Sequence, residues 1–438
     1  MKASAVKGLF AAAAAVVLTV TPLAGWSVTI DVTKFQQRYP WNGLVDIDYT
    51  ITRSEDDATL DPMKYSVRIT VVNCETAVTN VAHVFRQVQL PVSDGAHRVT
   101  WDANAENITF KSQNVKVFAE IVHYAEKYMI IDVSGGPNTN CYPVTYLHGA
   151  PEGGFNRDED KNEYKGNKIV LRLIPPGSFV MGSPTTEPGR VGQNYDTSAR
   201  EVQHVVTITK PFYIGVFEIT QKQYENVMGS NPSQYKGANR PVEQVTYEDI
   251  RGKTEGAKWP HANSVDEESF MGKLRDKCKE WDSDKQDFAK DIEGLFDLPT
   301  EAQWEYACRA GTTTPFNNGK PCAKDGDLDT QLMLLGRYVS NRGTSQHAVV
   351  GTYAPNAWGL YDMHGNVWEW CLDWYQVDVQ NIENASVNPV GPANGTNRMG
   401  RGGSWNDGAR SCRSAFRTGP VPSNVSTGYG FRLSRTLP

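Results

Sequence analysis

The sequence predicts two globular domains, an all-β sandwich followed by a larger α+β domain with irregular secondary structure. Its 438 residues are too many for one ordinary domain, because domains usually contain about 100–200 residues. Short runs of alternating apolar and polar residues dominate the first third of the chain. The 38 Gly, 24 Pro and 11 Trp indicate many turns and loops anchored by aromatic side chains.

The composition also limits the function. Hydrophobic residues make up 39% of the chain and charged residues 21%, so the chain has enough apolar material for packed cores. The formal net charge is −6, and the sequence contains no cluster of Lys and Arg. Since binding to phosphate backbones needs clustered cations, we expect no nucleic-acid partner.

Residues 1–25 have the pattern of a signal peptide. Lys2 and Lys7 precede an apolar run at positions 8–20, and small residues follow it. This run of about 13 residues is shorter than the 18 or more that cross a bilayer, and no later segment is long and apolar enough, so we expect no transmembrane span. We therefore predict bacterial-type export to a secreted, periplasmic or cell-envelope location; an uncleaved N-terminal anchor is the alternative.

Residues 26–133 have the pattern of antiparallel strands with one buried face. Alternating runs rich in β-branched residues occupy positions 44–51, 65–71, 97–101 and 115–121, with turn residues between them. A β-sandwich fits this pattern. No residues in it have catalytic spacing, so we expect an accessory domain.

Residues 134–165 are rich in Gly, Pro, Asn and charged side chains, which predicts a linker with one strand-like run at 142–147. Beyond it we expect strands over 169–183, 205–209 and 212–219. Thr220 is the expected N-cap of a helix, and Thr300 with Gln303 has the spacing of a capping box. A further helix is expected around 270–281.

Five separated segments of the second domain resemble, in order, the formylglycine-generating-enzyme (sulfatase-modifying factor) family. They are IPPGSFVMGS at 174–183, LPTEAQWEYA at 298–307, NAWGLYDMHGNVWEW at 356–370, RGGSW at 401–405 and GFRL at 430–433. Each segment alone is weak, but five in the same order are specific. The resemblance covers residues 166–438 and implies an irregular C-type-lectin-like α+β fold.

The segment 359–370 places two carboxylates around a glycine turn, and carboxylate and carbonyl oxygens are the ligands that Ca²⁺ prefers. The matching positions in the family form a structural calcium site. The resemblance therefore implies calcium held by Asp362, Glu369 and the carbonyls of Gly365 and Val367. In the alternative interpretation, the two carboxylates cap turns or pair with arginine.

The family's enzymes bind copper(I) through two cysteines five residues apart. Alignment on the RGGS motif places Cys412 at the second cysteine and Asp407 at the first. A carboxylate is a hard ligand that suits copper(I) poorly, so we expect no copper cofactor. If oxidase chemistry is retained in a remodelled site, the resemblance implies Cys412, Ser404 and Trp368 as catalytic residues; otherwise Cys412 is a small buried apolar residue.

Three function classes stay open. The first is a non-oxidase module that binds a glycan, peptide or protein through Asn406, Asp407, Arg410 and Arg413. The second is an enzyme, either a copper oxidase that converts a sulfatase cysteine to formylglycine or a related oxidase. The iron-dependent relatives use a triad of histidines, and the eight His here show no such cluster. The third is a structural component of the envelope.

Overall fold

The computed structural model describes thirteen segments of the chain. They are residues 28–38, 44–53, 65–73, 78–82, 93–103, 115–123, 127–156, 163–190, 201–292, 294–322, 328–343, 345–377 and 387–437. The predicted signal peptide lies outside these described residues. The chain divides into two compact units, residues 1–124 and 125–438.

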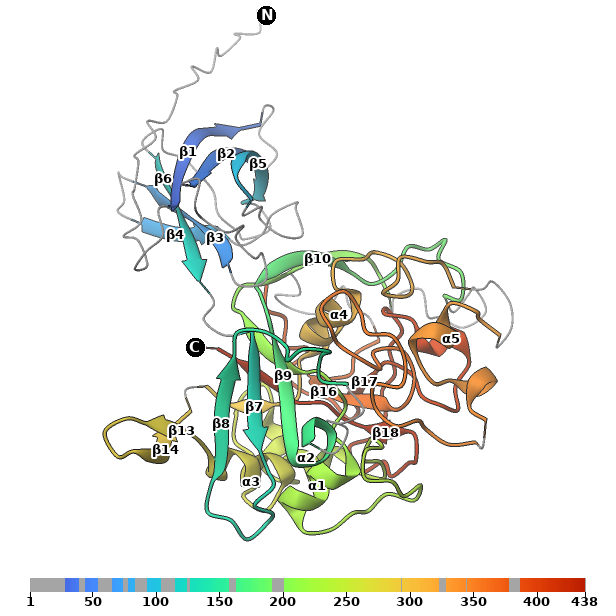
Figure 1. Ribbon diagram of the computed structural model, residues 1–438. Coiled ribbons are helices and arrows are strands. Elements are labelled where there is room, and N and C mark those ends of the chain that lie inside the picture. Colours follow the sequence, from blue (N-terminus) through green and yellow to red (C-terminus); the bar gives the residue numbers. More distant parts are fainter. Residues whose placement is uncertain are drawn as a thin grey trace, which may run out of the picture. The chain divides into compact units, whose positions relative to one another are not determined.

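The first unit contains two antiparallel three-stranded sheets among its described residues (Figure 1). One has the order β1 (Val28–Gln37), β2 (Leu44–Arg53), β5 (Gly95–Asp102), and the other β4 (Val78–Ala82), β3 (Tyr65–Asn73), β6 (Val115–His123). Alternate residues of β2, among them Val45 and Ile47, are buried, and they share one apolar cluster with Val67 and Ile69 of β3. The period-2 pattern therefore produces strands that each bury one face.

The second unit is built on a mixed eight-stranded sheet. Its order is β14 (Asp287–Asp291), β13 (Cys278–Asp282), β8 (Tyr142–Leu147), β7 (Tyr128–Asp132), β9 (Lys168–Ile174), β12 (Phe212–Gly215), β19 (Ser434–Thr436), β15 (Phe296–Asp297). Only the pair β8 and β13 is parallel within the described sheet. All four residues of β12 are buried, as expected of a central strand covered on both faces.

The boundary between the units differs from the sequence prediction. We expected the first domain to end at residue 133 and residues 134–165 to form a linker. Instead β7 pairs with β8 and β9 of the second unit, and β8 lies inside the expected linker. Alternation identifies a strand but does not say which sheet it joins, because pairing depends on residues distant in sequence.

Short helices and two small sheets complete the second unit. The α-helices are α1 (Gln221–Met228), α2 (Tyr247–Arg251), α3 (Phe270–Lys277), α4 (Glu301–Arg309) and α5 (Leu332–Leu335). The small sheets pair β10 (Gly177–Met181) with β11 (His204–Ile208), and β16 (Trp368–Trp374) with β17 (Arg398–Arg401) and β18 (Tyr429–Gly430). Among the described residues, no helix has the length and apolar character needed to cross a bilayer.

The predicted helix starts are confirmed. Thr220 and Thr300 are the N-caps of α1 and α4, and each forms a capping box with a glutamine three residues later. The helix expected over 270–281 is too long, because α3 ends at Lys277 and Cys278 begins a strand that pairs with β8. The mixed α/β character with few short helices agrees with the α+β part of the predicted fold class.

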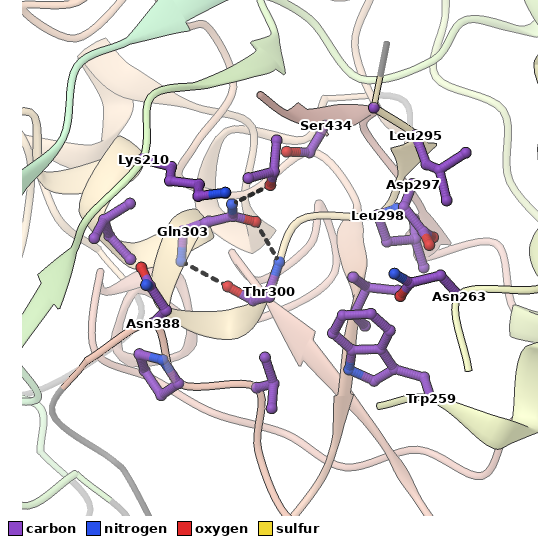
Figure 2. A pocket seen from close by; sticks show the side chains of 16 residues that line it. Lys210, Trp259, Asn263, Leu295, Asp297, Leu298, Thr300, Gln303, Asn388 and Ser434 are labelled. Carbon is purple, nitrogen blue, oxygen red and sulfur yellow. Dashed lines mark hydrogen bonds between the residues drawn. The ribbon is translucent and has the colours of Figure 1, made fainter. Parts of the chain in front are cut away.

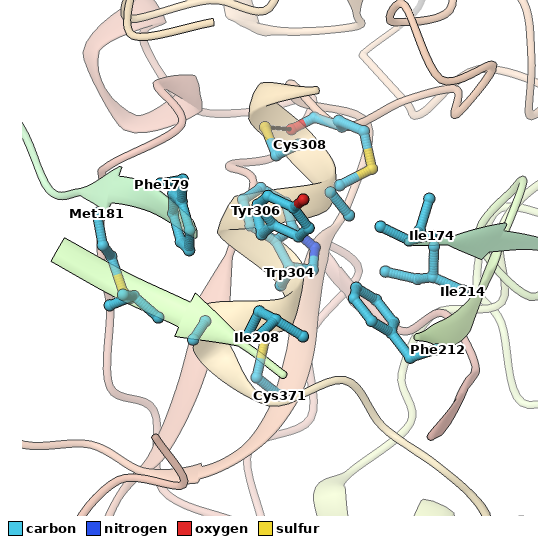
Figure 3. Packing of buried hydrophobic residues seen from close by; sticks show 14 of the residues in the cluster. Ile174, Phe179, Met181, Ile208, Phe212, Ile214, Trp304, Tyr306, Cys308 and Cys371 are labelled. Atoms are coloured by element: carbon cyan, nitrogen blue, oxygen red, sulfur yellow. Dashed lines mark hydrogen bonds between the residues drawn. The ribbon is translucent and has the colours of Figure 1, made fainter. Parts of the chain in front are cut away.

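Helix α4 lies in the middle of the main core of the second unit. Figure 3 shows Trp304 and Tyr306 of α4 between Phe179 on one side and Ile174 and Ile214 on the other. The ring of Tyr306 tilts against that of Phe179 with centroids 5.2 Å apart. The motif around residues 298–307 is therefore a capped helix that carries large aromatic side chains into the core.

Candidate functional site

The RGGSW motif forms a sharp turn at the end of β17. Gly402 and Gly403 both have positive φ, at 95° and 79°, a conformation that favours glycine. A Cβ atom on Gly403 would lie 2.6 Å from Sγ of Cys412, so only glycine fits this close approach. The two glycines therefore fold the loop back onto the short helical turn Ala409–Cys412.

Asp407 lies half-buried on this loop, and two side chains donate hydrogen bonds to it. Nε1 of Trp368 donates to Oδ2 of Asp407 over 2.9 Å, and Oγ of Ser404 donates to the same oxygen. The ring of Trp368 also stacks on Tyr429, with centroids 6.0 Å apart and 18° between the planes. We call Asp407, Ser404, Trp368 and Tyr429 the Asp407 patch. It joins three of the predicted site residues.

Cys412 is not part of an open site. Its side chain is fully buried in an apolar cluster that includes Phe316, Leu332 and Tyr338. Burial, followed by the charge of Asp407, raises the pKa of the Cys412 thiol well above its ordinary value. A thiol in this environment stays protonated, whereas copper(I) binding and nucleophilic chemistry need the thiolate. The geometry corresponds to the alternative in which Cys412 is a small buried apolar residue.

His364 fixes the backbone at Cys412. Its Nε2 accepts a hydrogen bond from the N–H of Asn317 over 3.1 Å, so Nδ1 carries the proton and donates to the Cys412 carbonyl over 2.8 Å. Burial lowers the pKa of His364 to about 4. This neutral histidine holds the turn in place and has no access to a reacting group.

The predicted ligand-binding residues divide into two kinds. Asn406 and Arg410 are exposed, and Oδ1 of Asn406 accepts a hydrogen bond from Arg342. The prediction for Arg413 is wrong, since its side chain is fully buried between Glu187 and Glu201. Two carboxylates hold this guanidinium inside the protein, which leaves it unable to meet a ligand.

The two predicted calcium carboxylates are both buried, but their hydrogen bonding differs. Oδ2 of Asp362 accepts from the N–H of Gly351 over 2.6 Å, while Oδ1 has no partner among the described residues. Both oxygens of Glu369 accept from Arg432 over 2.6 Å, and Nε1 of Trp304 donates to Oε2 over 2.8 Å. Glu369 therefore forms the arginine pair of the alternative interpretation, and Asp362 alone retains an oxygen suited to a cation.

Sequence reasoning missed Glu218, a fully buried carboxylate close to this cluster. Nδ2 of Asn366 and the N–H of Val367 donate to its two oxygens. Burial, followed by the charges of Asp362 and Glu369, raises the pKa of Glu218 well above its ordinary value. A carboxylate inside the apolar run 214–219 was the available signal, because an isolated charge in a buried segment needs polar partners. The strand expected over 212–219 ends at Gly215, before Glu218.

Comparison with known proteins agrees with this architecture. The model of the sulfatase-modifying factor enzyme 1-like domain matches residues 157–437. The chain belongs to this family. The relatives of the family that it resembles include the chaperone protein LppX of Paenibacillus barcinonensis, 32% identical over 232 residues that are 49% of this chain and 76% of LppX. The formylglycine-generating enzyme of Mus musculus is 27% identical over 285 residues, 60% of this chain and 73% of the enzyme.

Other family relatives are longer proteins. The serine/threonine-protein kinase pkn1 of Chlamydia pneumoniae is 37% identical over 141 residues, 32% of this chain, and the chain spans only 21% of that kinase. Among solved structures, PvdO from Pseudomonas aeruginosa is 25% identical with a TM-score of 0.46, covering 61% of this chain and 94% of PvdO.

Proposed function

We propose that this chain is an exported, non-oxidase ligand-binding protein, with a glycan, peptide or protein as its ligand. The carrying observation is the Asp407 carboxylate, which accepts hydrogen bonds from Trp368 and Ser404. Alignment on the RGGS motif places it at the first copper cysteine. The burial of Cys412 supports the same conclusion, because a single protonated thiol is a poor copper(I) ligand. The exposed side chains of Asn406 and Arg410 beside the patch would contact the ligand.

The remaining parts of the proposal concern the scaffold. We propose a C-type-lectin-like arrangement for the second unit and a β-sandwich accessory domain for the first. Two antiparallel sheets that share one apolar cluster support the sandwich. Export is supported by the charged and apolar pattern of residues 1–25.

The proposal includes a calcium ion because of one oxygen atom, Oδ1 of Asp362. Oδ1 of Asp362 is buried without a hydrogen-bond partner among the described residues, and an unpaired buried carboxylate oxygen is costly. The carbonyls of Gly365 and Val367 would complete the site with Asp362. Glu369 would contribute only if it released Arg432, so the four-ligand set implied by the family fits in part.

Metal binding tests the proposal directly. Titration of the reduced full chain with copper(I) against a chelator should show no stoichiometric tight binding, while the Asp407→Cys variant supplies a matched two-thiol control. Elemental analysis after calcium loading should find about one Ca²⁺ per chain, lost in Asp362→Ala. Tight copper binding by the unaltered chain that disappears in Cys412→Ala would overturn the non-oxidase proposal. If the loaded protein contained no calcium, only the calcium part of the proposal would be contradicted.

Ligand binding needs its own measurement. We expect the chain to bind selected members of a glycan or peptide array, with binding lost in Asp407→Ala and kept in Lys320→Gln, an exposed lysine. Oxygen uptake with a cysteine-containing sulfatase peptide should stay at the background rate. Uptake above that rate would support the copper-oxidase alternative.

A further inference from the structure

A cavity of about 510 Å³ opens in the second unit at the β15 end of the large sheet. None of its lining residues belongs to the Asp407 patch or to the predicted calcium site. Its volume lies within the range of about 300–1,000 Å³ typical of small-molecule sites. The cavity is therefore a binding site candidate that the family resemblance does not assign.

The cavity has a buried floor and an exposed rim. Figure 2 shows Lys210, Gln303 and Thr300 on one side and Trp259 and Leu295 on the other. Leu298, Leu372 and Ile208 are almost fully buried in the lining, whereas Leu295 is 45% exposed. A ligand would thus find apolar walls from several separate segments, which suits an aliphatic or aromatic body.

The polar groups of the floor already bond to one another. Oε1 of Gln303 accepts from the N–H of Thr300 over 3.0 Å, and its Nε2 donates to Oγ1 of Thr436 over 2.8 Å. The carboxylate of Asp297 is neutralised by Arg251 and Arg275. These groups are satisfied without a ligand, so they shape the cavity more than they select its contents.

Lys210 is the one charged lining residue that forms no ion pair within the described part of the chain. Its side chain is exposed, and Figure 2 shows it extending from the rim toward the middle of the lining residues. An ammonium group at the mouth of an apolar cavity favours a negatively charged end on a ligand. We propose that this cavity binds a small amphipathic carboxylate, with its apolar body against Trp259 and Leu295 and its carboxylate at Lys210.

Calorimetry on the full chain tests this site with 2-naphthoate and its neutral analogue 2-naphthylmethanol. We expect one saturable site that prefers the carboxylate by about threefold at low salt, as an exposed ion pair would give. Lys210→Gln should abolish the preference and Lys210→Arg should keep it. Leu295→Trp should weaken both ligands at least about fivefold by narrowing the mouth.

Matched controls are Lys320→Gln and Leu334→Trp, which change an exposed lysine and an exposed leucine outside the lining. Both should bind like the unaltered chain. The proposal is overturned by absence of saturable binding, by equal affinity for the acid and the alcohol, or by a Leu295→Trp variant that binds both ligands unchanged. Since all five substitutions are at exposed positions, we expect every variant to fold.

Discussion

Arg432 is fully buried, and its guanidinium donates to both oxygens of Glu369 and to the carbonyls of Gly215 and Tyr361. Burial alone would lower the pKa of Arg432, but the charge and hydrogen bonds of Glu369, together with the charges of Glu218 and Asp362, raise that pKa. The pair connects the GFRL motif to the WEW motif. The two segments are thus held together by charge as well as by packing.

Replacement of Arg432 by Met should destabilise the protein strongly. The Glu369 carboxylate would remain buried without its cation, a change that typically costs about 3–5 kcal/mol. Urea unfolding followed by tryptophan fluorescence measures the loss. Arg410→Met, at an exposed arginine, is the matched control and should stay within about 0.5 kcal/mol. Equal effects of the two variants would contradict this role for Arg432.

At this scale the sequence located the loop but not the surroundings of each side chain. Asp407 and Cys412 both lie on the loop that follows the RGGS motif. The burial of Arg413 could not be predicted, because its partners Glu187 and Glu201 lie 226 and 212 residues away. Local spacing carries no information about such distant pairs.

Helix α4 is the element that connects the predicted pattern to the core. Its N-cap Thr300 accepts from the N–H of Gln303 over 3.2 Å, and the Gln303 side chain accepts from the N–H of Thr300. Further along the helix, Glu305 bonds Arg309 over 2.8 Å. The capping box therefore fixes where a short, fully buried helix begins.

We expect Thr300→Ala to lower the free energy of unfolding by about 1 kcal/mol, because the N-terminal N–H groups lose their acceptor. Thr300→Ser keeps the hydroxyl and should restore most of the loss. Chemical unfolding of the three proteins under one buffer condition is the measurement. An Ala variant as stable as the unaltered chain would show that α4 does not depend on this cap.

Capping residues could be predicted because their chemistry is local. Strand membership could not be predicted. The run at 142–147 has a strand pattern in isolation, but only long-range pairing assigns β8, together with β7, to the large sheet. The same limit applies to α3, whose apparent continuation past Lys277 is β13, a strand that pairs with both β14 and β8.

Across the whole second unit, buried carboxylates respond to pH in opposite directions. Burial, followed by the charge of Glu301, raises the pKa of Asp373 to about 7. For Glu301 itself, burial would raise the pKa, but the charges of Arg417 and Arg401 lower it. Asp373 thus takes up a proton on folding near neutral pH, whereas Glu301 stays ionised.

Linkage then predicts a stability maximum on the mildly acidic side. The contribution of Asp373 is fully present below its unfolded pKa of about 4 and is lost as pH rises through about 7. The contribution of Glu301 is present above its unfolded pKa and is lost as pH falls through its lowered folded pKa. The contribution of Asp373 should therefore decline from about pH 4 to about pH 7 and change little above that.

Asp373→Asn isolates the alkaline limb of this profile, because the amide resembles the protonated acid. We expect the variant to match the unaltered chain near pH 4 and to exceed it at pH 8. Urea unfolding at the two pH values gives both comparisons. A variant that is equally destabilised at both would place the pH dependence elsewhere.

The broad organisation of the molecule could be predicted from the sequence. Several motifs in the same order as in the family identify the domain, even though individual contacts cannot be inferred from them. The family assignment over residues 157–437 confirms that prediction. The predicted boundary between the two units was wrong. By composition alone, β7 belongs with the first domain and β8 belongs with the linker.

Strand β19 lies between β12 and β15, and Oγ of Ser434 donates to the carbonyl of Tyr213, 221 residues earlier in the chain. A ribosome must therefore synthesise these 221 residues before β12 acquires this neighbour. Until then one edge of a buried strand stays open to other chains, which is an aggregation hazard during synthesis. The order of translation thus makes the last strand of the sheet the step that closes the domain.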